Sequence, residues 1–340
     1  MIGGISDGMN LLAKQTGRRL WNSVRVLSSY QASRRSGVPS IKGLPISLSI
    51  EPTTSCNLRC PECPSGLRSF SRPTGMLETG LFQRVIDELS PTLTYLTFYF
   101  QGEPFLNPSF LDMVSYAASK GIYTSTSTNA HYLREEQAKK TVASGLDRLI
   151  ISIDGTTQDT YEAYRVGGEL SKVIEGARNI IRFKKELRSA TPQVIFQFLV
   201  VRPNEHQIDD LHKLASSVGV DKVVLKTAQI YDYENGSDLI PKNQDFSRYK
   251  KNASGKYEIK NELLDHCWKM WNSCVITWDG KVVPCCFDKD AKYVLGELNK
   301  NTFHEIWFGE KYDKFRSSLL KSRKEIDICR NCTEGTKVWA

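Results

Sequence analysis

The stretch SIEPTTSCNLRCPECPSG, residues 49–66, places Cys56, Cys60 and Cys63 in one loop with the spacing C-x3-C-x2-C. The loop directly follows an apolar run of the kind that forms a buried strand. A disulfide pairs two thiols and would leave the third over, and a structural zinc site usually takes four ligands. A zinc site completed by a distant residue and three unrelated buried cysteines are the simpler alternatives.

Composition is that of a soluble globular protein. The 340 residues, 40% apolar and 25% charged, suffice for one large α/β domain and a smaller module. No apolar run approaches the roughly 18 to 20 residues of a membrane helix, and the N-terminus lacks the features of a signal peptide. We therefore expect a cytoplasmic protein whose nine cysteines are metal ligands or reactive thiols rather than disulfides.

The net charge of +8 is concentrated at the N-terminus. Residues 1–42 hold seven Lys and Arg against one acid, Asp7, which gives +6 and leaves +2 for the other 298 residues. Leucine, tryptophan and valine lie among these cations. The arm is either a basic amphipathic helix for a membrane surface or an acidic peptide, or a helix packed over the edge of a partial barrel. We favour packing, and nothing here indicates nucleic acid.

Strand-like runs alternate with amphipathic helical stretches between Leu44 and about Ala228. Such alternation predicts parallel β/α units, in an open doubly wound sheet or a partial barrel. The six runs are PISLSIE (45–51), LTYLTFYFQ (93–101), IYTSTSTN (122–129), RLIISID (148–154), QVIFQFLVV (193–201) and DKVVLKTA (221–228).

Polar motifs follow the first four runs, at the carboxyl ends where α/β folds carry their functional residues. The cysteine loop follows the first run, QGEP (101–104) the second, STNAH (127–131) the third and SIDG (152–155) the fourth. Each motif alone is more often a helix cap or a turn. Because all four fall on one edge, we predict a site there.

The remaining six cysteines lie near the C-terminus. VITWDGKVVPCC (275–286) predicts a hairpin, TFHEIWFGEKYDKFRSSLL (302–320) one or two helices, and CRNC closes the group. We expect four parts: a basic N-terminal arm (1–43), the α/β domain (44–230), a polar linker with turns (231–265) and a small metal-organised module (266–340).

Three thiolates fix three corners of a [4Fe–4S] cluster and leave the fourth iron open. The segment resembles the signature of the radical SAM enzymes, over about residues 44–230. This resemblance implies a partial (β/α)6 barrel in which Cys56, Cys60 and Cys63 hold the cluster and S-adenosylmethionine binds the open iron. It further implies reductive cleavage to a 5′-deoxyadenosyl radical that abstracts a substrate hydrogen, with a low-potential flavodoxin or ferredoxin as electron donor.

The same resemblance assigns cofactor-binding residues. In QGEP, Gly102 and Glu103 match the turn that contacts the amino group of S-adenosylmethionine, and Gln101 replaces a glycine. Glu62 stands where many members carry an aromatic residue, which weakens the expectation of adenine stacking.

Five further matches follow from the motifs after the third and fourth strands. Ser127 and Asn129, with Ser152 and Asp154, match positions that contact the ribose. Arg165 matches an arginine that pairs with the methionyl carboxylate, a partner that suits a guanidinium fork. Its alternative is an ordinary arginine at the end of a surface helix.

The C-terminal segment resembles the SPASM and twitch modules, which implies auxiliary iron–sulfur binding. Modules with two auxiliary clusters need more cysteines after the final C-x2-C, and none follows here. We therefore predict one auxiliary [4Fe–4S] cluster, with a zinc ribbon as the alternative. The expected ligands are Cys267, Cys285, Cys329 and Cys332. Cys274 is the alternate, and Cys286 should face away if the strand continues.

A closed auxiliary cluster would relay electrons, which favours a net oxidation. Our main functional hypothesis is a radical SAM oxidoreductase that dehydrogenates a sugar-like or other small molecule. The alternative is a peptide-modifying maturase that forms a cross-link or thioether, and the non-enzymatic alternative is a zinc or iron–sulfur scaffold. The sequence names no catalytic acid or base.

Overall fold

A computed structural model describes residues 2–335, with side chains from Asp7 onward. The chain divides into two compact units, each built from separate segments. The loop unit comprises residues 2–10, 56–69 and 125–262, and contains the three-cysteine loop. The auxiliary unit comprises residues 11–55, 70–124 and 263–335, and contains the six C-terminal cysteines. The domain boundaries expected from the sequence stay a prediction, and residues 1 and 336–340 lie outside the described part.

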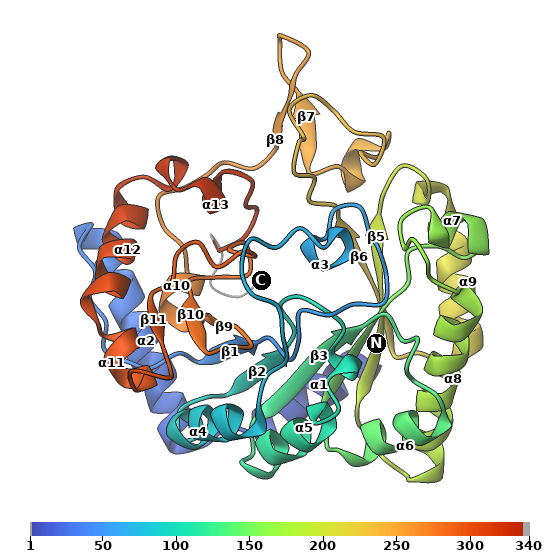
Figure 1. The fold of residues 1–340 in the computed structure, drawn as a ribbon, viewed down its shortest axis with the longest axis horizontal. Coiled ribbons are helices and arrows are strands. Elements are labelled where there is room, and N and C mark those ends of the chain that lie inside the picture. The colour runs from blue at the N-terminus through green and yellow to red at the C-terminus, as the bar shows by residue number, and fades with distance from the viewer. Residues whose placement is uncertain (1, 336–340) are drawn as a thin grey trace. The chain divides into compact units, whose positions relative to one another are not determined.

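The auxiliary unit contains five strands of the main sheet, in the order β11-β10-β9-β1-β2 (Figure 1). Parallel pairs join β1 to β2 and to β9, whereas β9, β10 and β11 are antiparallel. The predicted hairpin is therefore confirmed, and it extends the sheet from the first predicted strand. The bounds are β1 (Ser47–Ile50), β2 (Tyr95–Phe98), β9 (Val275–Ile276), β10 (Lys281–Val283) and β11 (Gly296–Glu297).

Helix α4 of the auxiliary unit buries the apolar face that its sequence pattern predicts. In α4 the buried Phe82 packs on Phe98 of β2, with ring centroids 5.5 Å apart. The predicted C-terminal helical stretch forms two helices, α11 and α12. The bounds are α2 (Gly17–Ser36), α4 (Thr79–Leu89), α5 (Phe110–Ser119), α10 (Lys269–Asn272), α11 (Phe303–Trp307), α12 (Glu310–Lys321) and α13 (Asp327–Arg330).

The loop unit contains four parallel strands in the order β3-β4-β5-β6. They are β3 (Tyr123–Thr128, which begins at the unit boundary), β4 (Arg148–Ser152), β5 (Gln193–Val200) and β6 (Lys222–Thr227). Helices alternate with them: α3 (Pro64–Leu67), α6 (Glu135–Ala143), α7 (Gln158–Glu162), α8 (Leu170–Glu186) and α9 (Ile208–Val218). Helix α1 (Ile2–Ala13) belongs to the loop unit up to Asn10, and its last three residues belong to the auxiliary unit.

All six predicted strands are present, and the predicted α/β class with a largely parallel sheet is confirmed. No closed barrel is formed by residues 2–335. Within the same range, no helix is both long and apolar enough to cross a membrane.

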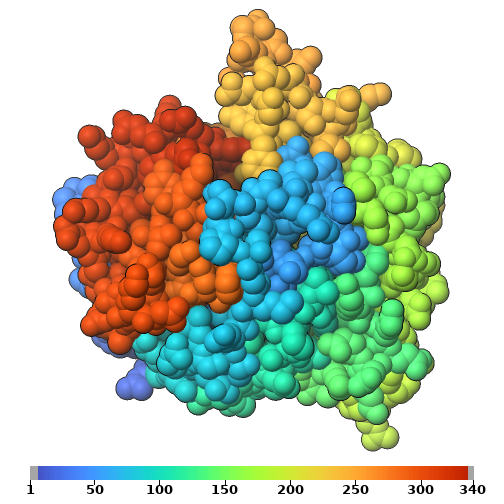
Figure 2. Space-filling model, in the orientation of Figure 1, coloured from blue at the N-terminus to red at the C-terminus, as the bar shows by residue number. Residues whose placement is uncertain are grey.

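The predicted linker is more ordered than its sequence indicates. It forms an antiparallel pair, β7 (Tyr249–Lys251) and β8 (Tyr257–Ile259), which lies on the surface in Figure 2. Tyr249 is buried and stacks on Tyr233 with centroids 4.7 Å apart. Strands of three residues are too short to show an alternation, so the aromatic packing that holds them was not visible in the sequence.

Candidate cofactor sites

The three-cysteine loop is a compact turn closed by the short helix α3. Cys63 precedes α3, and its N–H donates to the Cys60 carbonyl over 3.3 Å. A Cβ on Gly66 would lie 2.6 Å from the backbone N and O of Cys60, so only glycine allows α3 to approach this closely. Cys60 is buried, while Cys56 and Cys63 are partly exposed. The backbone therefore holds the three thiols in a fixed local arrangement.

Hydrogen bonds from Arg59 and to Glu62 help to attach this loop to the rest of its unit. The Arg59 N–H donates to the Val166 carbonyl over 2.9 Å. The Glu62 carboxylate accepts the N–H of Tyr231, also over 2.9 Å. Glu62 thus has a structural role at a position where the resemblance led us to look for an aromatic side chain.

Arg165 lies between a buried carboxylate and a cysteine of the loop. Its Nε donates to Asp154 Oδ2 over 2.5 Å, and its Nη1 is 3.8 Å from Cys60 Sγ. Asp154 is fully buried, and its other oxygen accepts the Leu199 N–H over 2.6 Å. Burial raises the pKa of the Cys60 thiol and the Arg165 charge opposes this, so Arg165 favours the thiolate that a metal needs. The predicted contacts of Asp154 with ribose and of Arg165 with a carboxylate stay predictions.

The other ribose-matching residues lie at the ends of β3 and β4. Ser127 Oγ is 3.4 Å from Ser152 Oγ. Asn129 donates to Asn57 Oδ1 over 2.8 Å, and its amide nitrogen is 4.0 Å from Cys56 Sγ. Asn129 therefore lies beside the cysteine loop, and the contacts of Ser127, Asn129 and Ser152 with ribose stay predictions.

His131 fixes the backbone of Asn129 and the start of α8. Its Nδ1 is 2.9 Å from the Asn129 carbonyl, and its Nε2 accepts the Glu169 N–H over 2.8 Å. These two partners require a neutral ring with the proton on Nδ1. Burial lowers the pKa of His131, which also favours the neutral ring.

In the auxiliary unit, the QGEP turn packs on the segment that leads into the cysteines. Gly102 has φ of +74°, and a Cβ there would lie 2.2 Å from the Thr53 carbonyl oxygen. The Glu103 N–H donates to the Ser55 carbonyl over 2.8 Å. The turn therefore fixes the backbone of Ser55, the last residue of its segment before the cysteine loop.

A buried ion pair in the auxiliary unit was missed by the sequence analysis. Arg72 Nη1 and Nη2 donate to the two carboxylate oxygens of Glu51 over 2.8 and 2.6 Å. The Trp278 N–H also donates to Glu51, over 3.2 Å. Glu51 directly precedes the cysteine segment and Arg72 follows it, so the pair ties its two ends together. A glutamate at the end of a buried strand is the only sequence signal for it.

Four of the six C-terminal cysteines line one narrow cavity, and they are the four predicted as ligands: Cys267, Cys285, Cys329 and Cys332. Arg323, almost fully buried, lies in the same wall and donates to the carbonyls of His266 and Glu334. The pKa of the Cys332 thiol is raised to about 12, because the effect of burial exceeds the opposing effects of the Glu334 N–H and the Arg323 charge.

The remaining two thiols do not line this cavity. Cys274 is buried elsewhere, and Cys286 is exposed. We expected Cys286 to face away from the cluster site if the strand continued through it. The strand does not continue, because β10 ends at Val283, and both adjacent cysteines lie in the turn that follows.

The four-cysteine cavity fits an iron–sulfur cluster in two respects. A Cβ on Gly335 would lie 2.2 Å from Cys267 Sγ, so a glycine keeps this thiol accessible. Among the described residues, no three His, Cys, Asp or Glu side chains converge closely enough to hold a single metal ion. Four thiols spread around a cavity suit a cluster with iron at separate corners better than one Zn²⁺.

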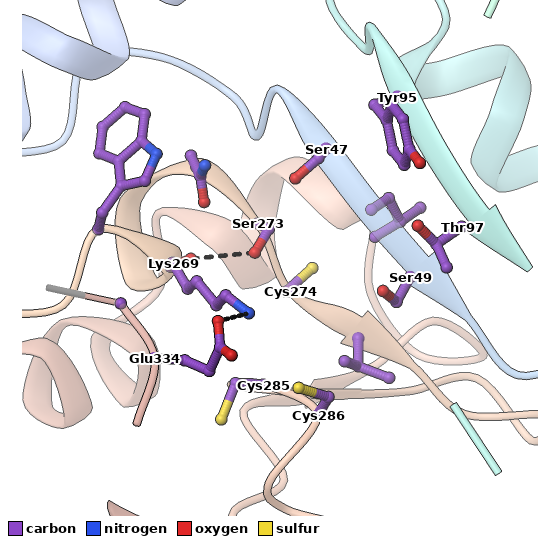
Figure 3. Close-up of a pocket in the computed structure, with 15 residues that line it drawn as sticks. Ser47, Ser49, Tyr95, Thr97, Lys269, Ser273, Cys274, Cys285, Cys286 and Glu334 are labelled. Carbon is purple, nitrogen blue, oxygen red and sulfur yellow. Dashed lines mark hydrogen bonds and ion pairs between the residues drawn. The ribbon is translucent and has the colours of Figure 1, made fainter. Parts of the chain in front are cut away.

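A larger cavity of about 410 Å³ lies beside Cys285 in the auxiliary unit (Figure 3). Lys269 Nζ and Glu334 Oε2 form an ion pair of 3.2 Å there, and Cys286 also faces this space. The polar sides of β1 and β2 complete the wall with Ser47, Ser49, Tyr95 and Thr97. Its volume lies in the usual range for a ligand site. Lys269 and Glu334 were not found from the sequence because 64 residues separate them.

Family comparisons agree with both cysteine groups. Residues 50–215 match the model described as Radical SAM superfamily. Residues 267–333 match SPASM, described as an iron–sulfur cluster-binding domain. Together these matches indicate [4Fe–4S] clusters and S-adenosylmethionine as cofactors.

Three curated relatives span most of the chain. A tungsten-containing aldehyde ferredoxin oxidoreductase cofactor-modifying protein from Pyrococcus furiosus is 27% identical, over 84% of this chain and 86% of that protein. Mycofactocin maturase MftC from Mycobacterium ulcerans is 29% identical, over 85% and 80%. PqqA peptide cyclase from Gluconobacter oxydans is 24% identical, over 87% and 84%.

Solved structures share the fold at low identity. Streptococcus suis SuiB bound to S-adenosylmethionine superposes with a TM-score of 0.63 at 13% identity, over 92% of this chain and 76% of that chain. This likeness concerns the fold alone.

Proposed function

Because the chain belongs to the radical SAM superfamily and carries a SPASM iron–sulfur domain, we propose that this enzyme modifies a peptide substrate. The observation that carries the proposal is the near-full-length similarity to a protein named as a peptide cyclase, over 87% of this chain. A second relative is named as a maturase. These names favour the peptide alternative over the oxidation of a sugar-like molecule that we placed first from the sequence.

The residues of the three-cysteine loop are suited to the first cluster. Cys56, Cys60 and Cys63 would hold it, and with S-adenosylmethionine bound that cluster supplies the radical chemistry of the superfamily. Arg165 supports the charge of Cys60, and Gly66 lets α3 close the loop. The contacts with S-adenosylmethionine that the resemblance assigns to Gly102 and Glu103 in the auxiliary unit, and to Ser127, Asn129 and Ser152 in the loop unit, remain part of this proposal.

The C-terminal residues are suited to one auxiliary cluster and an adjacent substrate pocket. Cys267, Cys285, Cys329 and Cys332 would hold the cluster, with Arg323 compensating its charge. The cavity beside Cys285 offers hydroxyl groups and the Lys269–Glu334 pair, which can hydrogen-bond to peptide amides or a polar side chain. A reducing cytoplasm and a low-potential flavodoxin or ferredoxin remain part of the proposal, since two groups of cysteines placed as metal ligands fit a reducing compartment.

The test is an anaerobic turnover assay with the reconstituted full-length protein. S-adenosylmethionine, dithionite and synthetic peptides from short reading frames next to the gene would be incubated together and analysed by mass spectrometry. We expect 5′-deoxyadenosine and a peptide that has lost two hydrogens, as a cross-link or thioether requires.

A parallel reaction with sugar and aminocyclitol alcohols separates the alternatives. A new carbonyl on an alcohol, with every peptide unchanged, would overturn the proposal and restore the small-molecule hypothesis.

A further inference from the structure

Helix α2 (Gly17–Ser36) buries mostly polar side chains and exposes large apolar ones, which is the reverse of an ordinary surface helix. Its buried residues are mostly polar: Arg19, Asn22, Ser29 and Ser33, together with Val26 and Tyr30. Its large apolar residues face outward, with Leu20, Trp21 and Val24 exposed by 54%, 65% and 55%. Surface helices normally bury the apolar face.

Hydrogen bonds within the auxiliary unit satisfy most polar groups of the buried face. Arg19 donates to the carbonyls of Ser90 and Lys120 over 2.9 and 3.0 Å. Asn22 donates to the Leu44 carbonyl and accepts the Leu44 N–H. Helix α2 is therefore packed within its unit, as we favoured from the sequence, but the face that packs is the polar one. The apolar face is exposed to solvent.

The exposed face combines apolar and cationic side chains. With about 100° between successive residues, Leu20, Trp21 and Val24 lie within about 100° of one another around the helix axis. Arg18 and Arg25 follow on the side next to Trp21. The helix contains five arginines and no acid, and four of them are exposed: Arg18, Arg25, Arg34 and Arg35. Within the described part of the chain, none of these four forms an ion pair.

We propose that this outward face of α2 binds the surface of an anionic lipid membrane. An interfacial helix inserts Trp and aliphatic side chains between headgroups while arginines contact the lipid phosphates, and this face presents both. The positive charge of this face favours an anionic membrane over a second copy of the protein, because a second copy would place two arginine-rich faces against each other. The inference concerns a separate surface, and it does not depend on which substrate the enzyme modifies.

The test is co-sedimentation of the full-length reconstituted protein with vesicles. One set contains phosphatidylcholine alone and the other contains a quarter phosphatidylglycerol. We expect binding to the anionic set only, with loss at high salt. Trp21→Ser with Val24→Ser should weaken binding at least tenfold, and Arg18→Gln and Arg25→Gln about fivefold each.

Matched controls exclude general effects of surface changes. Leu187→Ser removes an exposed leucine and Lys139→Gln an exposed cation, both in the loop unit, and both should bind like wild type. Iron content and 5′-deoxyadenosine formation should stay unchanged in every variant, which shows that the fold is intact.

Three outcomes would overturn the proposal. They are equal binding to both vesicle sets, equal weakening by the controls, and a dimer in analytical ultracentrifugation that Trp21→Ser dissociates. Binding of free polyglutamate without any vesicle binding would assign the face to an acidic peptide instead.

Discussion

At the scale of single residues, two roles for Arg165 can be distinguished. The structure places it against Asp154 and Cys60, whereas the family resemblance predicts a contact with the methionyl carboxylate. If the charge supports the thiolate, Arg165→Ala should lose about four of about eight irons per reconstituted chain, and Arg165→Lys should lose fewer.

The control is Arg178→Ala, an exposed arginine on α8 that should keep all its iron. Full iron in Arg165→Ala, with a raised KM for S-adenosylmethionine, would instead support the carboxylate contact.

His131 should make stability depend on pH. Because burial lowers its pKa below the usual value of about 6.5, the unfolded chain binds more protons in this range. The contribution to the free energy of unfolding is therefore complete above about pH 6.5 and decreases as the pH falls below it. Anaerobic urea titrations between about pH 7.5 and 6 should show a shallower slope for His131→Gln than for wild type. His212→Gln, on an exposed position of α9, should keep the wild-type slope, and parallel curves for all three proteins would contradict the assignment.

The Glu51–Arg72 ion pair should contribute much more to the free energy of unfolding than an ion pair on the surface. Its side chains are 0% and 5% exposed, so Glu51→Ala would leave a buried guanidinium unpaired. We expect the free energy of unfolding to fall by about 3–5 kcal/mol. Lys314→Ala breaks an exposed pair on α12 and should change little in the same denaturation experiment. A Glu51→Ala variant as stable as the control would show that Arg72 finds other partners.

At the scale of elements, Arg19 joins three helices. Its guanidinium binds backbone carbonyls at the carboxyl ends of α4 and α5, where a cation also complements the helix dipoles. Arg19→Met should lower the free energy of unfolding by about 2–4 kcal/mol. Its neighbour Arg18 is exposed, so Arg18→Met is the matched control and should be neutral in thermal denaturation. Equal stability of both variants would contradict this role.

Element prediction succeeded where a pattern was long or chemically specific. The six strands and the hairpin followed from β-branched runs, alternation and an Asp-Gly turn. Alternation could not reveal β7 and β8, which have three residues each. Nor could the sequence show which face of α2 is buried, because that depends on carbonyls at Ser90 and Lys120, some 70 to 100 residues away.

At the scale of the whole molecule, the two cysteine groups define the enzyme, and they were found from cysteine spacing together with the family resemblance. Grouping Cys267 and Cys285 with the final C-x2-C agrees with the cavity that these four thiols line. The Glu51–Arg72 and Lys269–Glu334 pairs were missed because each joins distant segments, and only the folded chain shows which charges meet.

Iron counting tests the auxiliary ligand set directly. Cys329→Ala and Cys332→Ala should each lose about four irons per reconstituted chain, while Cys274→Ala and Cys286→Ala should lose none. Zinc in place of the missing iron in wild type would support the zinc-ribbon alternative. Iron loss in Cys274→Ala would show that the cavity rearranges when metal binds.

The pairing of β9 with β1 has a consequence for biosynthesis. Val275 is synthesised 225 residues after Ile50. At a synthesis rate of about 5–20 residues per second, the edge of β1 that pairs with β9 stays unpaired for roughly 10–45 s. An open strand edge is a template for wrong pairing, and this one is filled only when the cysteine-rich end emerges. Nascent chains should therefore need protection during this interval. Deleting the C-terminal module would make that exposure permanent, so single cysteine substitutions are the cleaner way to remove its cluster.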